Sequence, residues 1–222
     1  MLVSLNDYSA AVFDLDGTLL NTLRDISEAA NRSLQRHGYP SHPANAFCAF
    51  IGDGPDVLFQ RATQAGKDSS PCITELVETY REECIRQQDR YTTLYPGLTE
   101  FMPHLQTAGL QLTILTNKRQ LHAERCVERF LDRWEWQVVL GSGDHIPRKP
   151  DPAGALKIAS DLNTAPEKCL YFGDTDVDMW TAKRAGMTAV GVLWGFRNQQ
   201  ELESAGADVI IRHPKDLIEQ EG

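Results

Sequence analysis

The chain has 222 residues and a formal net charge of −9, with the apolar and charged fractions of an ordinary globular protein. This length allows one large domain, or a core of about 150 residues that carries a smaller insert. The acidic balance and the lack of a Lys/Arg run argue against nucleic acid and anionic lipid as partners. No stretch reaches the ~20 apolar residues of a membrane span, so no membrane association is expected.

The N-terminal segment and the cysteines predict a cytoplasmic protein. Residues 1–10 contain one acidic residue and no basic one, which is unlike a secretory signal. The five cysteines are widely spaced and form no CxxC pair. Unpaired thiols in a reducing compartment are therefore expected, rather than a disulfide framework or a zinc site. The oligomeric state cannot be read from these features.

Short apolar runs alternate with helical patterns along the chain, which predicts an α/β fold. The runs hold Val, Ile, Leu and Phe at consecutive positions, as is typical of strands buried on both faces of a parallel sheet. The expected strands are residues 10–13, 111–115, 137–140, 169–172, 188–193 and 208–211. With helices on both faces, they would form a Rossmann-like, mostly parallel sheet.

The interval between residues 20 and 95 lacks a convincing strand pattern and is dominated by helical patterns. These patterns are interrupted at residues 37–40, 52–55 and 68–71. An all-helical cap inserted after the first strand is the simplest interpretation. The catalytic core would then comprise residues 1–19 and 96–222, and the cap residues 20–95.

Several helix starts carry capping signals. Thr22 with Asp25 three residues later resembles a capping box at the start of the insert. In the core, Thr99 is expected to cap one helix. Asp151 at the cap and Pro152 at the first position are expected to start another.

The first polar motif directly follows the first expected strand. Asp14 and Asp16 stand two residues apart, so both carboxylates could be aimed at one site just beyond that strand. Gly17 allows a tight turn there, and Thr18 completes the string DxDGT. One carboxylate of such a pair can attack phosphorus while the other transfers protons. Asp-x-Asp alone is more typical of a solvated turn, but the whole string after an apolar strand favours catalysis.

Two further motifs are expected at the same edge of the sheet, because ligands bind at the carboxyl ends of parallel strands. Thr116 and Asn117 follow the second expected strand, where a hydroxyl and backbone N–H groups could hold a phosphate oxygen. Lys149 lies among three prolines, which stiffen its loop and could fix its ammonium group. Taken alone, each motif is more typical of a turn or a surface loop.

The fourth motif contains Asp174 and Asp178, after the fourth expected strand. A carboxylate there is well placed to bind a hard cation, although acidic residues are also favoured at any helix N-terminus. If Asp14, Asp16 and Asp174 converge, each pair of charges at ~4 Å repels by roughly 4 kcal/mol at an effective dielectric of 20. Mg²⁺, together with Lys149, would offset this repulsion and stabilise a transferred phosphoryl group.

In this order, the four motifs closely resemble those of the haloacid dehalogenase-like hydrolase superfamily. The resemblance extends over essentially the whole chain, and the helical insert is similar to the cap of one subgroup. Residues 50–54 of the insert resemble the glycine loop of phosphoglycolate phosphatase-like members. The resemblance implies that Gly52, Asp53 and Gly54 form a substrate loop of the cap, although the two glycines could instead only shape a turn.

The resemblance also implies a role for each motif residue. Asp14 would be the nucleophile, forming an aspartyl-phosphate, and a metal ligand. Asp16 would protonate the leaving alcohol, then activate water, and would ligate the metal through its backbone carbonyl. The phosphoryl group would be held by Thr116, Asn117 and Lys149.

The remaining motif residues would support the site. The resemblance implies that Asp174 is the side-chain metal ligand and that Asp178 orients Lys149. Gly17 and Thr18 would support the loop of the first motif. Dehalogenating members lack the second aspartate of that motif, so Asp16 indicates phosphate chemistry.

These roles describe a Mg²⁺-dependent phosphomonoester hydrolase that acts on a small phosphorylated metabolite, with 2-phosphoglycolate as one candidate. The carboxylate of that substrate would need a cationic or amide-rich partner. Arg24, Arg32 and Arg61 of the insert are candidates, although a helix arginine is usually solvated surface.

Three alternatives stay open at this point. A phosphosugar mutase of the same fold would return the phosphoryl group to its substrate instead of to water. A response-regulator receiver uses similar residue types, but in a different order and without a large helical insert. A non-catalytic binding protein could keep the fold, yet every catalytic position of the motifs is filled.

Overall fold

The computed structural model describes residues 4–64, 70–143 and 146–218. Parts of two segments named above, residues 1–3 and 68–69, lie outside this range. The chain divides into two compact units, one formed by Met1–Leu20 with Leu94–Gly222 and the other by Asn21–Thr93. We call them the core unit and the helical unit, and each is described by itself.

The core unit is built on a sheet of six strands in the order β5-β4-β1-β6-β7-β8. The strands are β1 (Ala10–Phe13), β4 (Gln111–Arg119), β5 (Trp136–Ser142), β6 (Cys169–Gly173), β7 (Thr188–Val192) and β8 (Val209–Ile211). Every neighbouring pair in this sheet is parallel. All six predicted strands are therefore present, and the predicted mostly parallel α/β fold is confirmed.

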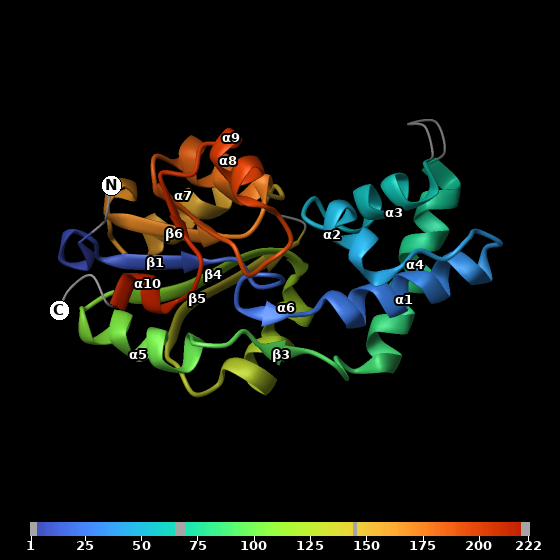
Figure 1. Ribbon diagram of the computed structural model, residues 1–222, viewed down its shortest axis with the longest axis horizontal. Coiled ribbons are helices and arrows are strands. Elements are labelled where there is room, and N and C mark those ends of the chain that lie inside the picture. The colour runs from blue at the N-terminus through green and yellow to red at the C-terminus, as the bar shows by residue number, and fades with distance from the viewer. Residues whose placement is uncertain (1–3, 65–69, 144–145, 219–222) are drawn as a thin grey trace. The chain divides into compact units, whose positions relative to one another are not determined.

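The helices of the core unit connect these strands, except for α10, which follows the last strand. They are α5 (Leu98–Thr107), α6 (Gln120–Cys126), α7 (Ala153–Asp161), α8 (Asp176–Ala185), α9 (Gln199–Ser204) and α10 (Lys215–Ile218). Shorter turns are the 3-10 helices η1 (Leu5–Asp7) and η4 (Pro166–Lys168) and the π-helical η3 (Val127–Leu131). Figure 1 shows α7, α8 and α9 on one face of the sheet and α5 and α10 on the other.

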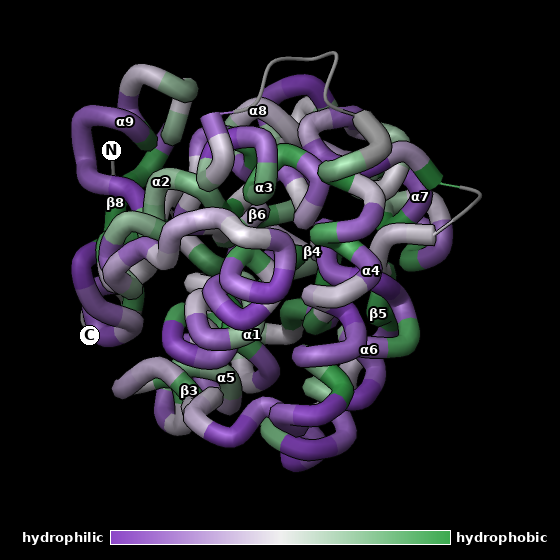
Figure 2. The backbone as a smooth tube through the Cα atoms, turned by 90° about the vertical axis from the view of Figure 1, so that its right-hand side faces the viewer, coloured by the Kyte–Doolittle hydropathy of each residue, from purple (hydrophilic) through white to green (hydrophobic). Residues whose placement is uncertain are grey.

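Each face of the sheet has its own apolar core, because successive strand residues point to opposite faces. Ala11 and Phe13 of β1 pack in a cluster with residues of α5, α6 and α10. Ala10 and Val12 pack in a second cluster with residues of α7, α8 and α9. The hydrophobic segments of Figure 2 include β5 and β8 of this sheet. The doubly covered sheet holds the carboxyl ends of its central strands in a fixed arrangement.

The helical unit is formed by α1 (Leu23–Arg36), η2 (Ala44–Ala46), α2 (Phe47–Phe50), α3 (Pro55–Thr63) and α4 (Ser70–Gln87). Here α1 packs on α4, and the hydroxyl of Ser33 donates to the carbonyl oxygen of Leu76 at 2.7 Å. A short ladder also occurs in this region of the chain. It pairs β2 (Leu20–Asn21) with β3 (Thr93–Leu94), which the sequence patterns did not predict.

Three predicted caps differ from the structure. Thr22 precedes α1 without a capping hydrogen bond from its side chain. The Asp25 carboxylate accepts from the Tyr91 N–H and the Thr92 hydroxyl, so it does not complete a capping box with Thr22. Gly97, rather than Thr99, is the N-cap of α5. The Asp151 carboxylate does accept from a backbone N–H of the first turn of α7, although the helix begins one residue later than predicted.

Among the helices of residues 4–64, 70–143 and 146–218, none has both the length and the apolar character needed to cross a membrane.

Candidate active site

Asp14 lies at the carboxyl end of β1, where the chain leaves the sheet. Its N–H donates to the Phe172 carbonyl of β6 at 3.0 Å, which continues the β1–β6 ladder by one residue. The side chain is buried, with only 7% of the residue exposed. A tight turn follows, in which Gly17 has a φ of 88° and donates its N–H to the Leu20 carbonyl. The first predicted motif thus starts in a buried position at the edge of the sheet.

The Asp174 carboxylate is held on both sides by hydrogen bonds. The Thr18 hydroxyl donates to its Oδ1 at 2.9 Å, and the Phe196 N–H donates to its Oδ2 at 2.8 Å. The indole of Trp194 donates to the carbonyl oxygen of Thr18 at 2.9 Å, which ties the loop after β7 to the first motif. A Cβ atom at Gly17 would collide with the Asp174 carboxylate. Glycine at this position therefore allows the turn and the close approach of a buried acid.

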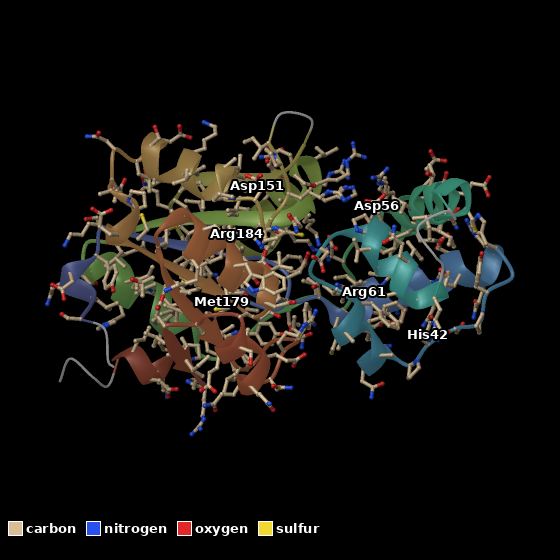
Figure 3. All side chains as sticks on the ribbon, turned by 90° about the horizontal axis from the view of Figure 1, so that it is seen from above. His42, Asp56, Arg61, Asp151, Met179 and Arg184 are labelled. Atoms are coloured by element: carbon tan, nitrogen blue, oxygen red, sulfur yellow. The ribbon has the colours of Figure 1, made fainter. Side chains whose placement is uncertain are left out.

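Lys149 is the central cation of the site. Its Nζ lies 2.9 Å from Asp14 Oδ1 and 2.6 Å from Asp178 Oδ1, and only 5% of the residue is exposed. The Asn117 side chain fixes the backbone of Lys149, donating to its carbonyl at 3.1 Å and accepting from its N–H at 2.9 Å. On the far side of the loop, Arg184 of α8 donates to the Pro150 carbonyl, and Figure 3 labels Asp151 and Arg184 in this region.

Asp178 also caps the helix on which it lies. Its Oδ2 accepts from the N–H and the hydroxyl of Thr175 at 3.1 and 2.6 Å, so the two residues form a capping box at the start of α8. Both oxygens of Asp178 therefore have donors, one from Lys149 and the other from Thr175. This helix end was predicted to favour acidic residues, but the capping role of Thr175 was not predicted.

Thr116 lies on β4, which continues to Arg119 instead of ending at residue 115. Between the pairs Leu115↔Leu140 and Arg119↔Ser142, three residues of β4 lie opposite a single residue of β5. Such a bulge disrupts the ladder and re-aims side chains next to active sites. The Thr116 hydroxyl is buried and accepts from the N–H of Lys118 at 3.2 Å.

Lys118, in the same bulge, is a functional candidate that the sequence analysis missed. Its ammonium donates to both carboxylate oxygens of Asp16 at 2.8 and 2.9 Å. The two side chains are 16% and 15% exposed. Its position in the sequence, directly after Thr116 and Asn117, could have identified Lys118 as a site residue. The four aspartates expected at this edge of the sheet need more than one cation to balance their charge.

Asp14, Asp174 and Asp178 form a buried cluster in which one oxygen of each lies within 4.8 Å of the others. Carboxylate oxygens in this number suit a hard divalent cation. Asp178 is engaged by the Lys149 ammonium and by Thr175, whereas the donors to Asp174 are the neutral Thr18 hydroxyl and Phe196 N–H, which makes Asp174 the better ligand of the two. The side chain of Asp16 is not part of it and pairs with Lys118, which leaves only its backbone carbonyl for the predicted ligand role.

The electrostatics of the cluster also favour a bound cation. Burial raises the pKa of Asp14 to about 6, while the charge of Lys149 lowers it and that of Asp178 raises it. Burial, followed by the charges of Asp178 and Asp14, raises the pKa of Asp174 well above its usual range. Burial lowers the pKa of Lys149, but the two neighbouring aspartates raise it well above the ordinary value. A cation would stabilise the ionised carboxylates.

The predicted substrate loop lies in the helical unit. Gly52 and Gly54 have positive φ angles of 134° and 93°, which fits the shaping of a turn. The carboxylate of Asp53 between them pairs with Arg61 at 2.6 Å. Asp53 and Arg61 therefore neutralise each other's charge by an ion pair within this unit.

Comparison with known proteins relates this arrangement to one enzyme family. A family model described as haloacid dehalogenase-like hydrolase matches residues 11–192. A phosphoglycolate phosphatase of Pseudomonas savastanoi pv. phaseolicola is 30% identical, over 93% of this chain and 77% of the relative. One of Aquifex aeolicus is 29% identical, over 93% of both chains.

The fold points to the same family. The structure of a haloacid dehalogenase-like hydrolase from Streptococcus pneumoniae superposes with a TM-score of 0.87 at 25% identity, over 97% of this chain and 99% of that one. The predicted resemblance is thereby confirmed. The chain belongs to the haloacid dehalogenase-like hydrolases.

Proposed function

We propose that this protein is a phosphatase that hydrolyses a small phosphate monoester through a covalent intermediate on Asp14. The observation that carries this proposal is the position of Asp14 beside Lys149, at 2.9 Å, and in one buried cluster with Asp174. A carboxylate nucleophile, a fixed ammonium and a cation site are the parts that phosphoryl transfer requires.

In the first step, an Asp14 oxygen attacks phosphorus and the bond from phosphorus to the ester oxygen breaks. Asp16 in its protonated form gives its proton to that oxygen, so the alcohol leaves neutral. Lys149 lies beside the nucleophile and would balance the negative charge of the phosphoryl oxygens. Thr116 and the Asn117 N–H, in the bulge of β4, are the proposed donors to the same oxygens.

In the second step, water attacks the phosphorus of the aspartyl-phosphate. Asp16, now ionised, accepts a proton from that water, and the bond between phosphorus and the Asp14 oxygen breaks. Inorganic phosphate leaves, and both aspartates return to their starting states. Asp178 has no direct part in either step, and its proposed role is to orient Lys149, to which it is paired at 2.6 Å.

Mg²⁺ is the proposed cation, with side-chain ligands from Asp14 and Asp174 and the backbone carbonyl of Asp16. When bound, it would stabilise charge on the phosphoryl oxygens. When Asp16 carries its proton, the other three carboxylates and the ammonium groups of Lys118 and Lys149 leave a formal charge of −1 among the named groups, and one divalent cation would make this charge positive for an anionic ester. Oxygen ligands of this kind suit Mg²⁺ better than softer metals.

The helical unit is the proposed cap. We choose 2-phosphoglycolate as the first substrate to test, because several curated relatives are phosphoglycolate phosphatases.

A phosphosugar mutase remains the second candidate from the sequence, and no contact described above favours it. A cytoplasmic location is also proposed, in keeping with five cysteines that form no disulfide.

A panel of small phosphate esters assayed for phosphate release tests this function. We expect turnover with Mg²⁺, loss of turnover in EDTA, and recovery when Mg²⁺ is restored. Undiminished turnover in EDTA would contradict the cation site. Isomerised phosphosugar without release of inorganic phosphate would identify a mutase instead.

A further inference from the structure

The two lysines of the site serve different sides of the proposed reaction. Lys149 is paired with Asp14 and Asp178, so its charge lies next to the nucleophile. Lys118 is paired with both oxygens of Asp16, the residue proposed to contact the leaving-group oxygen. The ammonium of Lys118 is therefore hydrogen-bonded directly to the proposed general acid, and we expect it to lie near the leaving alcohol.

The backbone of Lys118 is also held by a hydrogen bond. Its N–H donates to the Thr116 hydroxyl, and the bulge of β4 places both residues at the carboxyl edge of the sheet. A lysine carries three rotatable donors on a flexible stem and can bridge two anions. The Lys118 side chain is 16% exposed, against 3% for that of Lys149, so it is the more accessible of the two side chains.

The arginines considered for a substrate carboxylate are already engaged within the helical unit. Arg24 pairs with Glu28 at 3.0 Å and stacks on the ring of Tyr91. Arg32 pairs with the same Glu28 at 3.1 Å. Arg61 pairs with Asp53 at 2.6 Å. Within the core unit, the positive charge of Lys118 is paired with Asp16, the residue proposed to contact the leaving group.

We infer that Lys118 is a specificity-determining residue that binds a second anionic group of the substrate, located close to the ester oxygen, while it holds Asp16. This inference rests on the proposed phosphatase function. The substrate class that fits is a phosphate monoester whose alcohol carries a carboxylate on the neighbouring carbon. In such a molecule, the carboxylate lies near the leaving oxygen. It can therefore reach the Lys118 ammonium, which is paired with Asp16.

The test compares 2-phosphoglycolate with 2-hydroxyethyl phosphate, in which a hydroxymethyl group replaces the carboxylate. The variants are Lys118→Met and Lys118→Gln, with Lys118→Arg as a variant that keeps the charge. The matched control is Lys157→Met, because Lys157 makes the same two-oxygen pair with Asp161, at 2.9 and 2.8 Å, on the exposed surface of α7. Thermal unfolding of each variant verifies that it is folded.

The wild-type protein should prefer 2-phosphoglycolate. Lys118→Met and Lys118→Gln should lower kcat/KM for 2-phosphoglycolate at least tenfold more than for 2-hydroxyethyl phosphate, mainly by raising KM. Lys118→Arg should retain part of the preference, and Lys157→Met should retain all of it. Equal losses on both esters would overturn the inference, because Lys118 would then act only through Asp16. A wild-type enzyme that does not prefer the carboxylated ester would overturn it as well.

Calorimetric binding of 2-phosphoglycolate separates this inference from the proposed function. If the wild-type protein hydrolyses no phosphate ester, the phosphatase proposal fails. Weaker binding to Lys118→Met than to Lys157→Met would then still support an anion site at Lys118. Equal binding to the two variants would overturn it.

Discussion

The side chain of Asn117 makes two hydrogen bonds with the backbone of Lys149, one to its carbonyl oxygen at 3.1 Å and one from its N–H at 2.9 Å. The residues are far apart in the chain, so this pair joins the bulge of β4 to the loop that carries the central cation. Asn117 was expected to act through its backbone N–H. Its side chain has a separate task, which is to set the position of Lys149.

Asn117→Ala should therefore lower kcat by on the order of 10²-fold, because small displacements of a catalytic group have effects of this size. The backbone N–H remains, so inhibition by inorganic phosphate should change little. Loss of buried hydrogen bonds should also lower the free energy of unfolding by about 1–3 kcal/mol.

Asn31→Ala is the matched control for this change. Asn31 makes the same two hydrogen bonds with the backbone of His42, at 2.8 and 2.9 Å, and His42 is labelled in the helical unit in Figure 3. The control should lose similar stability with a much smaller change in kcat. Equal losses of kcat in both variants would contradict a specific role of Asn117.

Gly17→Ala tests the close packing around Asp174. Both Gly17 and Gly186 have positive φ angles, 88° and 75°, but an added Cβ atom has open space at Gly186 and collides with Asp174 and Phe196 at Gly17. Gly186→Ala should cost only about 1 kcal/mol of stability for the backbone conformation and should keep its activity. Gly17→Ala should cost more and should lose most of its turnover, as measured by denaturant unfolding and steady-state kinetics.

The contribution of Asp14 to the stability of the metal-free protein should fall as the pH rises from about 4 to 6. Burial raises the pKa of Asp14 from 3.8 to about 6, so the folded state keeps this proton after the unfolded chain has released it. The contribution of Asp14 is present in full below the unfolded pKa and is lost as the pH passes the folded one. The shift corresponds to about 3 kcal/mol.

Unfolding curves of wild-type protein and Asp14→Asn in EDTA, recorded from pH 4 to 7, measure this effect. The difference in stability between the two should shift in favour of Asp14→Asn as the pH rises. Saturating Mg²⁺ should reverse the trend for the wild-type protein, since the cation favours the ionised carboxylate. Parallel curves in EDTA would show that Asp14 is not destabilised by its burial.

Asp174→Asn should weaken the activating cation. A neutral amide in place of this buried ligand should raise the Mg²⁺ concentration for half-maximal activity at least tenfold, or about 1.4 kcal/mol. Asp176→Asn is the control, because Asp176 lies two residues further along and outside the carboxylate cluster. An unchanged Mg²⁺ requirement in Asp174→Asn would exclude Asp174 as a ligand.

Much of the architecture was predictable, because apolar strands buried on both faces leave a strong pattern and parallel strands end at a common edge. That rule was enough to predict the convergence of Asp14, Asp174 and Lys149 from three distant segments. The family and the α/β sheet are confirmed. The catalytic, phosphate-binding and metal roles of the individual residues stay predictions.

The unpredicted features depend on contacts between distant segments. The polar residues after position 115 resembled a turn, yet they continue β4 as a bulge, which left the pairing of Lys118 with Asp16 unforeseen. Likewise, the local spacing of Asp25 predicted a capping box. Its carboxylate is instead bound by Tyr91 and Thr92, more than sixty residues later. Local spacing cannot reveal which of two available partners a buried carboxylate takes.

Detection of a phospho-enzyme tests the role of Asp14 most directly. Rapid acid quench with radiolabelled substrate should trap label on the protein that is released by hydroxylamine, as an acyl phosphate is. Peptide mapping should locate it on Asp14, and Asp14→Asn should show neither label nor turnover. Label on another residue, or turnover of Asp14→Asn at the wild-type rate, would contradict the assignment of Asp14 as the nucleophile.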